Sequence, residues 1–572
     1  MRSLIPSIDL RLLAERAPGV VALSAATFGV LMAPDLIFQR RGIGVHPFES
    51  RQYWPVVLLL ALFLTMTEPR WLRVTVMSVI AFGQFVWFGA LQFFGGVLKP
   101  EQLQLAAHQA DEVAIGLEAS FGLLAPAIVI VALTTLALFL TQEFLGRRFA
   151  LRSRPGGVLL ITLLTIYVAR IFLHTDLFLM YPSAMTPSAL GPIHSLGVAI
   201  RASWTQREIA PDPKKTSYVL GVGERHDGPV TIVVIMGESV NAARLSLYDF
   251  ARDTTPNLKA FEISPPPGFV LLKKVGFSAG VATIASVPNF MKIPYYPVGL
   301  GMSPMSIFRI ASDNGFRSFY YSAQLAHSLD IAGDAHLIEQ VETAENWGDR
   351  LAQIHDDLII DFLHETPPAQ RRFFFLHQRV NHAPYIDNCD HVAATLYALK
   401  PEGPSAEDLR RNDYDNGLRC FDRSMKQIFD WASAQPGEVD VFYSSDHNEL
   451  MGEQGMWGHG PTHFLLSVVP MMLFTNRGDG AIANAFREMR LPTAFDFTAL
   501  IARALGTSVT VEGYDPDIFY VNAPLPFGLS GFLKVTRLAD GNFRSEHFNR
   551  SGHHLETQVV RLPDEIEYKY AK

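Results

Sequence analysis

The hydrophobic positions of the chain follow two patterns, and the change between them falls near Pro229. Before residue 174, apolar residues form long runs with few charges, whereas from Pro229 onward short apolar runs alternate with stretches of helical periodicity. Long uncharged runs are typical of membrane-spanning helices, and the alternation is typical of an α/β domain with a mostly parallel sheet. We therefore expect a membrane part followed by a water-soluble part.

Five apolar segments in the first part are candidate transmembrane helices, because a spanning helix needs about 20 mostly apolar residues. The second segment reaches that length only with its flanks, and the first contains Pro34 and Asp35, where we expect its outer end. The five segments are Val20–Phe38, Tyr53–Thr67, Val74–Phe94, Phe121–Thr141 and Gly157–Leu173.

The distribution of arginine predicts the orientation of these segments. Short cytoplasmic loops carry an excess of Lys and Arg. The N-terminus, the loop between the second and third segments and the loop between the fourth and fifth segments are all rich in arginine, although Arg40, Arg41 and Arg51 in the first outer loop run against the assignment. With five spans and a cytoplasmic N-terminus, the water-soluble part is expected to lie outside the cytoplasm.

The hydrophobic pattern of the water-soluble part predicts alternating strands and helices, with the helices on both sides of a sheet. We predict a linker over residues 177–228 after a membrane domain of residues 1–176, a catalytic domain over 229–513, and a C-terminal extension over 514–572 with a hairpin that turns at Asp540-Gly541. The predicted strands are Val230–Met236, Phe269–Val275, Phe316–Tyr321, Phe373–His377, Val439–Ser444 and Val468–Phe474. The predicted helices are Met305–Asn314, Trp347–Glu365, Asp408–Ser433 and Thr493–Leu505.

Composition narrows the function classes. The 572 residues carry a net charge of -8, which argues against a nucleic-acid-binding protein because such proteins usually carry a basic patch. The two cysteines, Cys389 and Cys420, cannot form a disulfide framework, and the sequence leaves open whether they pair.

Metal-type residues follow two of the predicted strands. Glu238 comes directly after the first strand, and Asp446 and His447 follow the strand Val439–Ser444. Ligands bind beyond the carboxyl ends of strands in open α/β sheets, and zinc accepts two carboxylates and an imidazole. We predict a metal site at these strand ends; caps or surface polar residues are the alternative for an isolated pair.

Thr283 is a candidate nucleophile beside that site. It follows the small residues Ala279–Ala282, and Pro288 fits the first turn of a helix. A hydroxyl at a helix N-terminus faces backbone amides that bind anions, and a metal lowers the pKa of a hydroxyl that it binds. An ordinary helix cap is the alternative.

Two histidine clusters lie in further loops. His377 and His382 follow the strand Phe373–His377, and His459 and His463 lie in a glycine-containing loop. Imidazoles bind a second metal or donate to phosphoryl oxygens, whereas a single histidine is more often structural.

Taken together, these stretches resemble the membrane-anchored phosphoethanolamine transferases of the alkaline phosphatase superfamily. The matching stretches are Gly237–Tyr248, Arg252–Leu258, Ala282–Pro288, His377–Pro384, Tyr414–Asn416, Ser445–Glu449, Gly452–Glu453 and His459–Gly460.

The resemblance implies an α-helical membrane domain and an alkaline-phosphatase-like domain with a mostly parallel sheet between helices. It implies a monomeric, multi-pass protein of the bacterial inner membrane that modifies lipopolysaccharide or another envelope glycan or lipid. Phosphatidylethanolamine is the implied donor. The implied cofactor is one or two Zn²⁺, with Glu238, Thr283, Asp446 and His447 as ligands. Thr283 is the implied nucleophile, and the group His377, His382 and His459 binds the phosphoryl group or a second Zn²⁺.

The chain departs from the lipid A-modifying members at several positions. Ala279 and Asn289 stand where a cysteine pair brackets the nucleophile, and Ser322–His327 replaces an Asn-rich stretch. A phosphoglycerol transferase that uses phosphatidylglycerol is the main alternative. A sulfatase is a lesser one, because no Arg follows Ser286-Val-Pro288 in the expected motif, and a non-catalytic membrane scaffold is the third.

Overall fold

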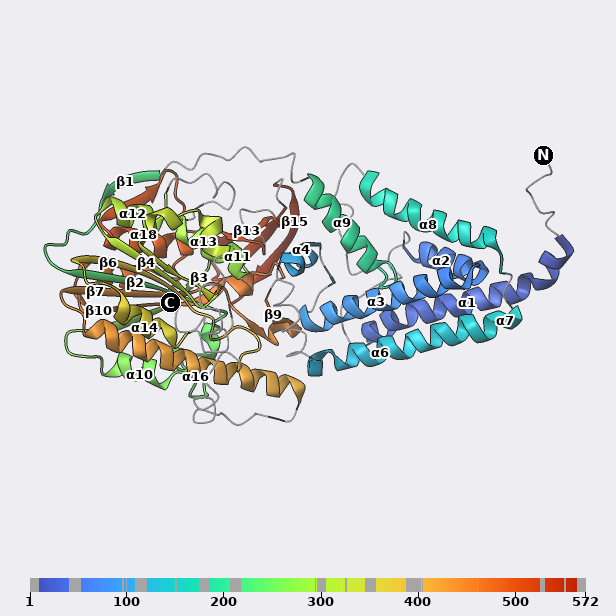
Figure 1. The fold of residues 1–572 in the computed structure, drawn as a ribbon, viewed down its shortest axis with the longest axis horizontal. Coiled ribbons are helices and arrows are strands. Elements are labelled where there is room, and N and C mark those ends of the chain that lie inside the picture. Colours follow the sequence, from blue (N-terminus) through green and yellow to red (C-terminus); the bar gives the residue numbers. More distant parts are fainter. Residues whose placement is uncertain are drawn as a thin grey trace. The chain divides into compact units, whose positions relative to one another are not determined.

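The computed structural model describes most of the chain (Figure 1). The described residues are 10–40, 53–94, 97–98, 100–108, 121–149, 152–173, 186–205, 218–293, 295, 305–324, 327–344, 356–386, 403, 405–459, 461–524, 530–549 and 552–562. They form two compact units, the first mostly from Met1–Ala110 and Ser120–Ile209, the second mostly from Ala210–Met451 and Gly458–Lys572. The predicted boundaries at residues 176, 228 and 513 stay predictions.

The first unit is helical. Four of its helical stretches are long and apolar enough to cross a membrane: Arg16–Arg40, Arg70–Gln92, Leu124–Phe149 and Arg154–Leu173. The second predicted span is a shorter apolar helix of 13 residues, so the count of five spans stays a prediction. The helices are α1 (Leu10–Arg40), α2 (Trp54–Met66), α3 (Arg70–Phe94), α4 (Pro100–His108), α6 (Phe121–Leu140), α7 (Gly146–Phe149), α8 (Arg154–Leu173) and α9 (Gly191–Thr205).

Helix α1 does not end at Pro34 and Asp35, as we expected from the sequence; it continues to Arg40. The Asp35 carboxylate is fully buried and accepts hydrogen bonds from the backbone N–H of Ser188 and, at 2.8 Å, from its hydroxyl. A buried carboxylate needs such partners, and Ser188 supplies them without ending the helix.

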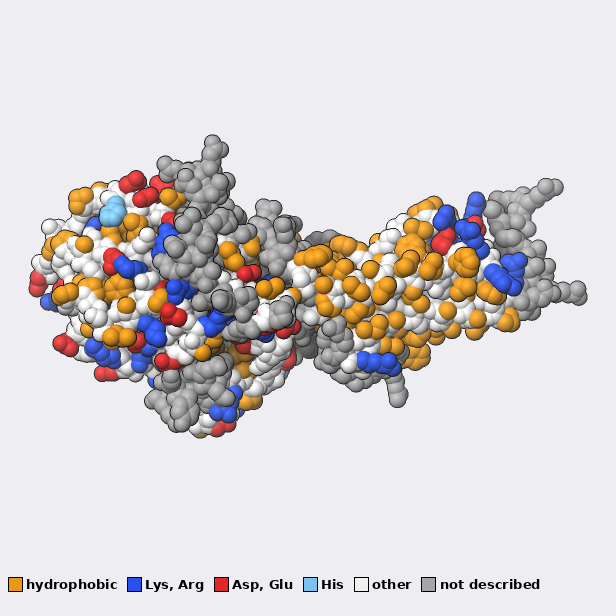
Figure 2. All heavy atoms as spheres, turned by 90° about the horizontal axis from the view of Figure 1, so that it is seen from below, with side chains coloured by type: hydrophobic (Ala, Val, Ile, Leu, Met, Phe, Trp, Pro, Cys, Tyr) orange, Lys and Arg blue, Asp and Glu red, His pale blue; other side chains and the backbone are white. Residues whose placement is uncertain are grey.

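The surface of the helical unit is strongly apolar. Figure 2 shows hydrophobic side chains over much of its visible face. Large apolar side chains that are more than half exposed include Val21, Phe82, Leu133, Phe144 and Ile166. Exposed apolar patches of this extent fit contact with lipid rather than with water.

The second unit is built on a seven-stranded sheet with the order β3-β10-β7-β2-β6-β4-β5. The pairs β7–β2, β2–β6, β6–β4 and β4–β5 are parallel, while β10 is antiparallel to both of its neighbours. The sheet is therefore mixed rather than uniformly parallel. Its strands are β2 (Val230–Gly237), β3 (Val270–Phe277), β4 (Arg317–Ser322), β5 (Gln340–Glu342), β6 (Arg371–His377), β7 (Glu438–Ser445) and β10 (Val468–Thr475).

Helices cover both faces of this sheet (Figure 1). Each of the six predicted strands is present within one or two residues of its expected ends. Residues 347–355 of the predicted helix Trp347–Glu365 lie outside the described residues. One face carries α11 (Thr283–Met291), α12 (Ile307–Asp313), α13 (His327–Ala332) and α18 (Ala494–Ala504). The other carries α10 (Pro256–Ile263), α14 (Leu358–Glu365) and α16 (Ala406–Ser433).

Beside the seven-stranded sheet, the described residues form three smaller sheets, one of which is the two-stranded pair β8 (Leu450–Met451) and β9 (Trp457–Gly458). Strand β1 (Tyr218–Val222) pairs with β11 (Thr507–Val511), and a four-stranded antiparallel sheet has the order β12-β13-β14-β15. The bounds of its strands are Ile518–Asn522, Phe532–Arg537, Phe543–Phe548 and His554–Val560. The pair β13–β14 turns at Gly541, which has a positive φ of 88°. Cys420 on α16 is disulfide-bonded, and the other cysteine, Cys389, lies outside the described residues.

Candidate active site

The site begins at the sharp turn after β2. Gly237 is the last residue of that strand, and a Cβ there would lie 2.1 Å from the Tyr443 hydroxyl oxygen, so only glycine fits. Ser239 follows with a φ of 57°, a left-handed conformation that costs a non-glycine residue about 1–2 kcal/mol. This conformation is used at the site, because the Ser239 N–H donates to Asp446 Oδ1 at 3.0 Å.

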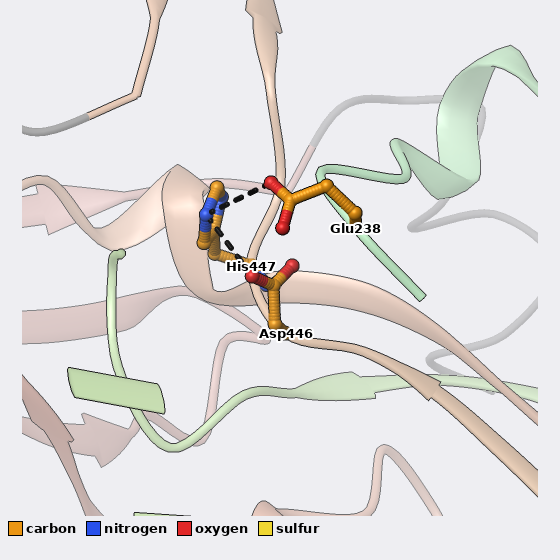
Figure 3. Close-up of side chains that lie close together, drawn as sticks. All are labelled: Glu238, Asp446 and His447. Carbon is orange, nitrogen blue, oxygen red and sulfur yellow. Dashed lines mark hydrogen bonds and ion pairs between the residues drawn. The ribbon is translucent and has the colours of Figure 1, made fainter. Parts of the chain in front are cut away.

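Parallel pairing brings the three predicted metal ligands together. Gly237 on β2 lies opposite Ser445 on β7, so the residues that follow each strand emerge side by side. Candidate ligand atoms of Glu238, Asp446 and His447 all lie within 4.8 Å of one another, and the three side chains are fully buried (Figure 3). Among the described residues, these three side chains are the group of metal-binding type that lies close enough together to hold an ion.

The donor atoms of this group fit a divalent cation. Asp446 Oδ2 is buried without a hydrogen-bond partner. His447 Nδ1 donates to the Asn448 carbonyl at 3.0 Å, which leaves Nε2 as the lone-pair nitrogen, 3.3 Å from Asp446 Oδ2 and 3.7 Å from Glu238 Oε1. Two carboxylates and one imidazole with such an orphaned oxygen suit Zn²⁺.

The pKa shifts of these side chains also favour a metal site. Burial and the neighbouring charge of Glu238 raise the pKa of Asp446 well above its usual range. Burial acts upward on Glu238 as well, but its histidine neighbours outweigh it and lower the pKa of that carboxyl. Burial lowers the pKa of His447 to about 4. Asp446 thus lacks a compensating positive charge when it is ionised, and a divalent cation bound to it would supply that charge.

Thr283 lies against this group. It is the first residue of α11, with Ala282 as the N-cap, and its hydroxyl lies 3.2 Å from both Glu238 Oε2 and His447 Nε2. The helix begins five residues earlier than we expected, so Pro288 lies inside α11 rather than in its first turn. The first amides of a helix have no intrahelical partner, so the hydroxyl stands beside anion-binding N–H groups.

Gln324 is a site residue that sequence reasoning did not assign. Its side-chain amide donates to Glu238 Oε2 at 2.6 Å and to the Gln378 carbonyl at 2.9 Å, and lies 3.1 Å from His377 Nε2. The other ring nitrogen of His377 contacts Ser322 at 3.2 Å, so His377 reaches Glu238 through Gln324. Gln324 could have been predicted from its position just after strand β4, because the same position after β2 identified Glu238.

His459 and His382 lie next to the buried group. The His459 ring centroid is 4.4 Å from that of His447 and 6.0 Å from that of His382. His459 Nδ1 also contacts Glu449 Oε2 at 2.7 Å. Burial acts to lower the pKa of His459, but the charges of Glu449, Glu238 and Asp446 and this hydrogen bond raise it to about 9. His459 is therefore a cation at neutral pH, suited to a phosphoryl group.

Replacing Glu449 tests that charge. Glu449 is buried and also accepts from the Tyr385 hydroxyl at 2.5 Å, so Glu449→Gln keeps the shape but removes the negative charge. A group with a raised pKa loses its proton as pH rises through that value, so a reaction that needs protonated His459 is expected to stop at a lower pH in the variant than in the unchanged chain. The pH–rate profile measures this. An alkaline limb that does not move would contradict it, and the exposed Glu512→Gln is the control.

Comparison with known proteins agrees with this arrangement. Residues 230–507 match the family model described as Sulfatase. The chain carries a sulfatase-family domain. This sulfatase-family domain spans the seven-stranded sheet, Thr283 and the three buried ligand candidates.

Curated relatives of the chain include phosphoethanolamine transferases. EptC of Escherichia coli K12 is 23% identical over 324 residues, which are 52% of this chain and 54% of that protein. The phosphatidylethanolamine transferase Mcr-1 of E. coli is 25% identical over 321 residues, 50% of this chain and 57% of that protein. The chain spans about half the length of the curated relatives it matches.

A solved structure extends the likeness beyond the sulfatase-family domain. The integral membrane lipooligosaccharide phosphoethanolamine transferase A of Neisseria meningitidis matches with a TM-score of 0.52 at 15% identity, over 86% of this chain and 96% of that one. This likeness shows a shared fold. The resemblance to phosphoethanolamine transferases inferred from the sequence is confirmed.

Proposed function

We propose that the chain transfers phosphoethanolamine from phosphatidylethanolamine to an envelope lipid or glycan, with Thr283 as the nucleophile. The observation that carries the proposal is the position of the Thr283 hydroxyl, 3.2 Å from both Glu238 Oε2 and His447 Nε2 at the start of α11. An oxygen nucleophile beside a cation site and free helix amides suits displacement at phosphorus. The names of the relatives support phosphoethanolamine as the group transferred.

Glu238, Asp446 and His447 would hold the Zn²⁺, and Thr283 is the fourth group within reach. When bound, the ion lowers the pKa of a nearby hydroxyl and offsets negative charge on the transferred group. Gln324 and the Ser239 hydroxyl, which donates to Glu238 Oε1 at 2.6 Å, orient Glu238. Such outer partners fix the direction of a ligand's lone pairs.

In the first half-reaction, Thr283 Oγ1 forms a bond to the phosphorus of phosphatidylethanolamine and the bond from phosphorus to the diacylglycerol oxygen breaks. The hydroxyl of Thr283, which donates to Glu238 at 3.2 Å, gives up its proton to solvent. Protonated His459 gives a proton to the departing diacylglycerol oxygen. The product is a phosphoethanolamine ester on Thr283.

In the second half-reaction, an acceptor hydroxyl attacks the phosphorus from the opposite side. The acceptor's proton passes to His459, which is neutral after the first step. The Thr283 oxygen leaves and takes a proton from solvent in place of the one that it lost. Thr283 and His459 therefore return to their starting protonation states. The His382 ring lies beside that of His459, at a centroid distance of 6.0 Å, and would donate to phosphoryl oxygens.

The apolar helices agree with a lipid donor. They would hold the chain in the inner membrane, with the sulfatase-family domain in the periplasm beside the outer leaflet. The acceptor would be a lipopolysaccharide component or another envelope glycan. The chain would act as a monomer.

Labelled donors test the proposal. The full chain in detergent micelles is given phosphatidylethanolamine or phosphatidylglycerol, each labelled in the headgroup. Label is expected to appear on the Thr283 peptide with the first donor and to release diacylglycerol in equal amount. Labelling from phosphatidylglycerol alone would favour a phosphoglycerol transferase instead. Hydrolysis of an aryl sulfate without labelling would favour a sulfatase.

A further inference from the structure

Arginine side chains gather at one end of the helical unit, where α3 and α8 begin and α7 ends. Figure 2 shows basic side chains concentrated toward one end of that unit. The described residues of 67–73, 141–149 and 152–154 contain six arginines against the two carboxylates of Glu68 and Glu143. The six, here called the arginine cluster, are Arg70, Arg73, Arg147, Arg148, Arg152 and Arg154. The transfer reaction proposed above uses none of them.

Glu143 is already shared by two arginines of the cluster. The Arg73 side chain is 1% exposed, and it donates to Glu143 Oε1 at 2.6 Å and to the Thr67 carbonyl at 2.9 Å. Arg70 Nε lies 3.0 Å from the other oxygen, Glu143 Oε2. One carboxylate thus faces two guanidinium groups, so these three side chains together keep a net positive charge.

Arg152 lies against the same turn of chain and lacks a partner of its own. One of its terminal nitrogens donates to the Gln142 carbonyl and would lie 2.5 Å from a Cβ at Gly146. Its Nε is buried without a hydrogen-bond partner among the described residues. Burial and the charge of Arg73 lower the pKa of Arg152, although nearby carboxylates act in the opposite direction. An anion beside Arg152 would supply both the missing acceptor and the missing negative charge.

The two turns that carry the cluster are joined through their backbones. The Ser153 N–H donates to the Met66 carbonyl at 3.0 Å, and the Glu68 N–H donates to the Ser153 carbonyl at 3.2 Å. Gly156 and Gly157 permit the close approach of α8, because a Cβ on either would collide with the carbonyl oxygen of Met66 or Glu68. The backbone beneath the arginines is therefore fixed, which lowers the entropy lost when they bind a ligand.

The exposed part of the cluster combines open charges with apolar rings. Arg147 and Arg154 are exposed and form no hydrogen bond or ion pair with the residues that the structure describes. Beside the arginines, Trp71 is 67% exposed and Phe144 is 76% exposed. An anionic phospholipid presents both a phosphate and acyl chains, so it matches both features. A free phosphate ion would match the charges and leave the rings exposed.

The position of the cluster along the helices also fits a lipid headgroup. It lies where the candidate span Leu124–Phe149 ends and the candidate span Arg154–Leu173 begins. The ends of spanning helices lie at the depth of the headgroups, and excess arginine there is typical of the cytoplasmic side. Basic pockets between helices on that side bind anionic headgroups.

We propose that the arginine cluster binds the phosphate of an anionic phospholipid in the cytoplasmic leaflet. Arg147, Arg152 and Arg154 would contact the phosphate, and the acyl chains would lie along Phe144 and Trp71. The lipid would be a bound structural partner of the helical unit rather than a substrate. The inference does not depend on the proposed transfer reaction.

Native mass spectrometry of the full chain released from detergent micelles tests this binding. The probes are phosphatidylglycerol and phosphatidylcholine with the same acyl chains, because phosphatidylcholine carries a phosphate but no net charge. One phosphatidylglycerol per chain is expected to stay bound, in preference to phosphatidylcholine. The double variant Arg147→Gln/Arg154→Gln is expected to bind phosphatidylglycerol on the order of tenfold more weakly. Both side chains are exposed, so the thermal midpoint without lipid should not change.

A matched control removes the same charge elsewhere. Arg40→Gln/Arg490→Gln changes two exposed arginines and is expected to bind phosphatidylglycerol as the unchanged chain does. Arg40 lies about 30 Å along α1 from Gly19, at which a Cβ would contact Phe149 beside the cluster. An equal loss of binding in this control would indicate attraction by overall charge and would overturn the site.

Three other results would also overturn it. Equal retention of the two lipids would show that charge is not recognised. Unchanged binding in Arg147→Gln/Arg154→Gln would place the lipid elsewhere, as for a donor held near Thr283. Displacement of phosphatidylglycerol by millimolar inorganic phosphate would indicate a site for a free anion. Absence of the Thr283 ester in the unchanged chain, with this lipid binding intact, would refute the proposed function alone.

Discussion

Thr283→Ala is expected to abolish phosphoethanolamine transfer, with a fall in rate of about 10⁴-fold or more, as for the loss of other covalent nucleophiles. The reason is that the Thr283 hydroxyl lies at the start of α11, 3.2 Å from both Glu238 and His447, and alanine removes the only oxygen of that side chain. The measurement is release of diacylglycerol from phosphatidylethanolamine, together with mass spectrometry of the peptide that contains residue 283.

The fold should survive this change. Thr283 is 8% exposed, and its hydroxyl is not the cap of α11, since Ala282 occupies that position. Alanine at the first helical position is well tolerated. Thr283→Ser keeps the oxygen and is expected to retain measurable transfer and the mass of the ester. Full activity in Thr283→Ala, with the thermal midpoint unchanged, would mean that another group carries the phosphoethanolamine.

The sequence was sufficient to place the metal candidates because one rule relates strand order to position. Residues that follow parallel strands emerge at the same edge of a sheet, so Glu238 after β2 and Asp446 and His447 after β7 meet once those strands are neighbours. The buried apolar runs identified the strands themselves. Thr283 was identified from the small residues before it, although α11 begins five residues earlier than Pro288 led us to expect.

Other parts of the site depend on geometry that one sequence does not encode locally. Gln324 follows β4, which lies two strands from β2 with β6 between them. Its contact with Glu238 depends on this strand order, which the sequence does not give. Ser239 adopts a left-handed backbone conformation without being a glycine, so its residue type does not indicate that conformation. Glu449 and the His459 ring that it hydrogen-bonds are ten positions apart in the sequence. The antiparallel direction of β10 was not predicted either, because the apolar pattern of a buried strand does not indicate its direction.

Asp446→Asn and His447→Ala are expected to lose one equivalent of bound zinc and most of the transfer activity. Asp446 Oδ2 is buried without a hydrogen-bond partner, and His447 Nε2 faces both carboxylates, so each change removes a charge or a lone pair aimed at the same place. Zinc content of the purified full chain, measured by mass spectrometry, gives the number of ions. The exposed His554→Ala on β15 is the control and should keep its zinc.

A stability measurement decides whether the lost zinc was bound at this site. Ligand that binds only the folded chain raises its thermal midpoint with concentration, so zinc added to the metal-free chain should raise the midpoint. The same addition should have little effect on His447→Ala. Burial and Glu238 raise the pKa of Asp446 in the metal-free chain, so protons should compete with zinc for this carboxyl and zinc affinity should fall as the pH is lowered. Unchanged zinc content in both variants, or an equal rise of the midpoint in His447→Ala, would reject Glu238, Asp446 and His447 as the zinc site and with it the activation of Thr283 by that ion.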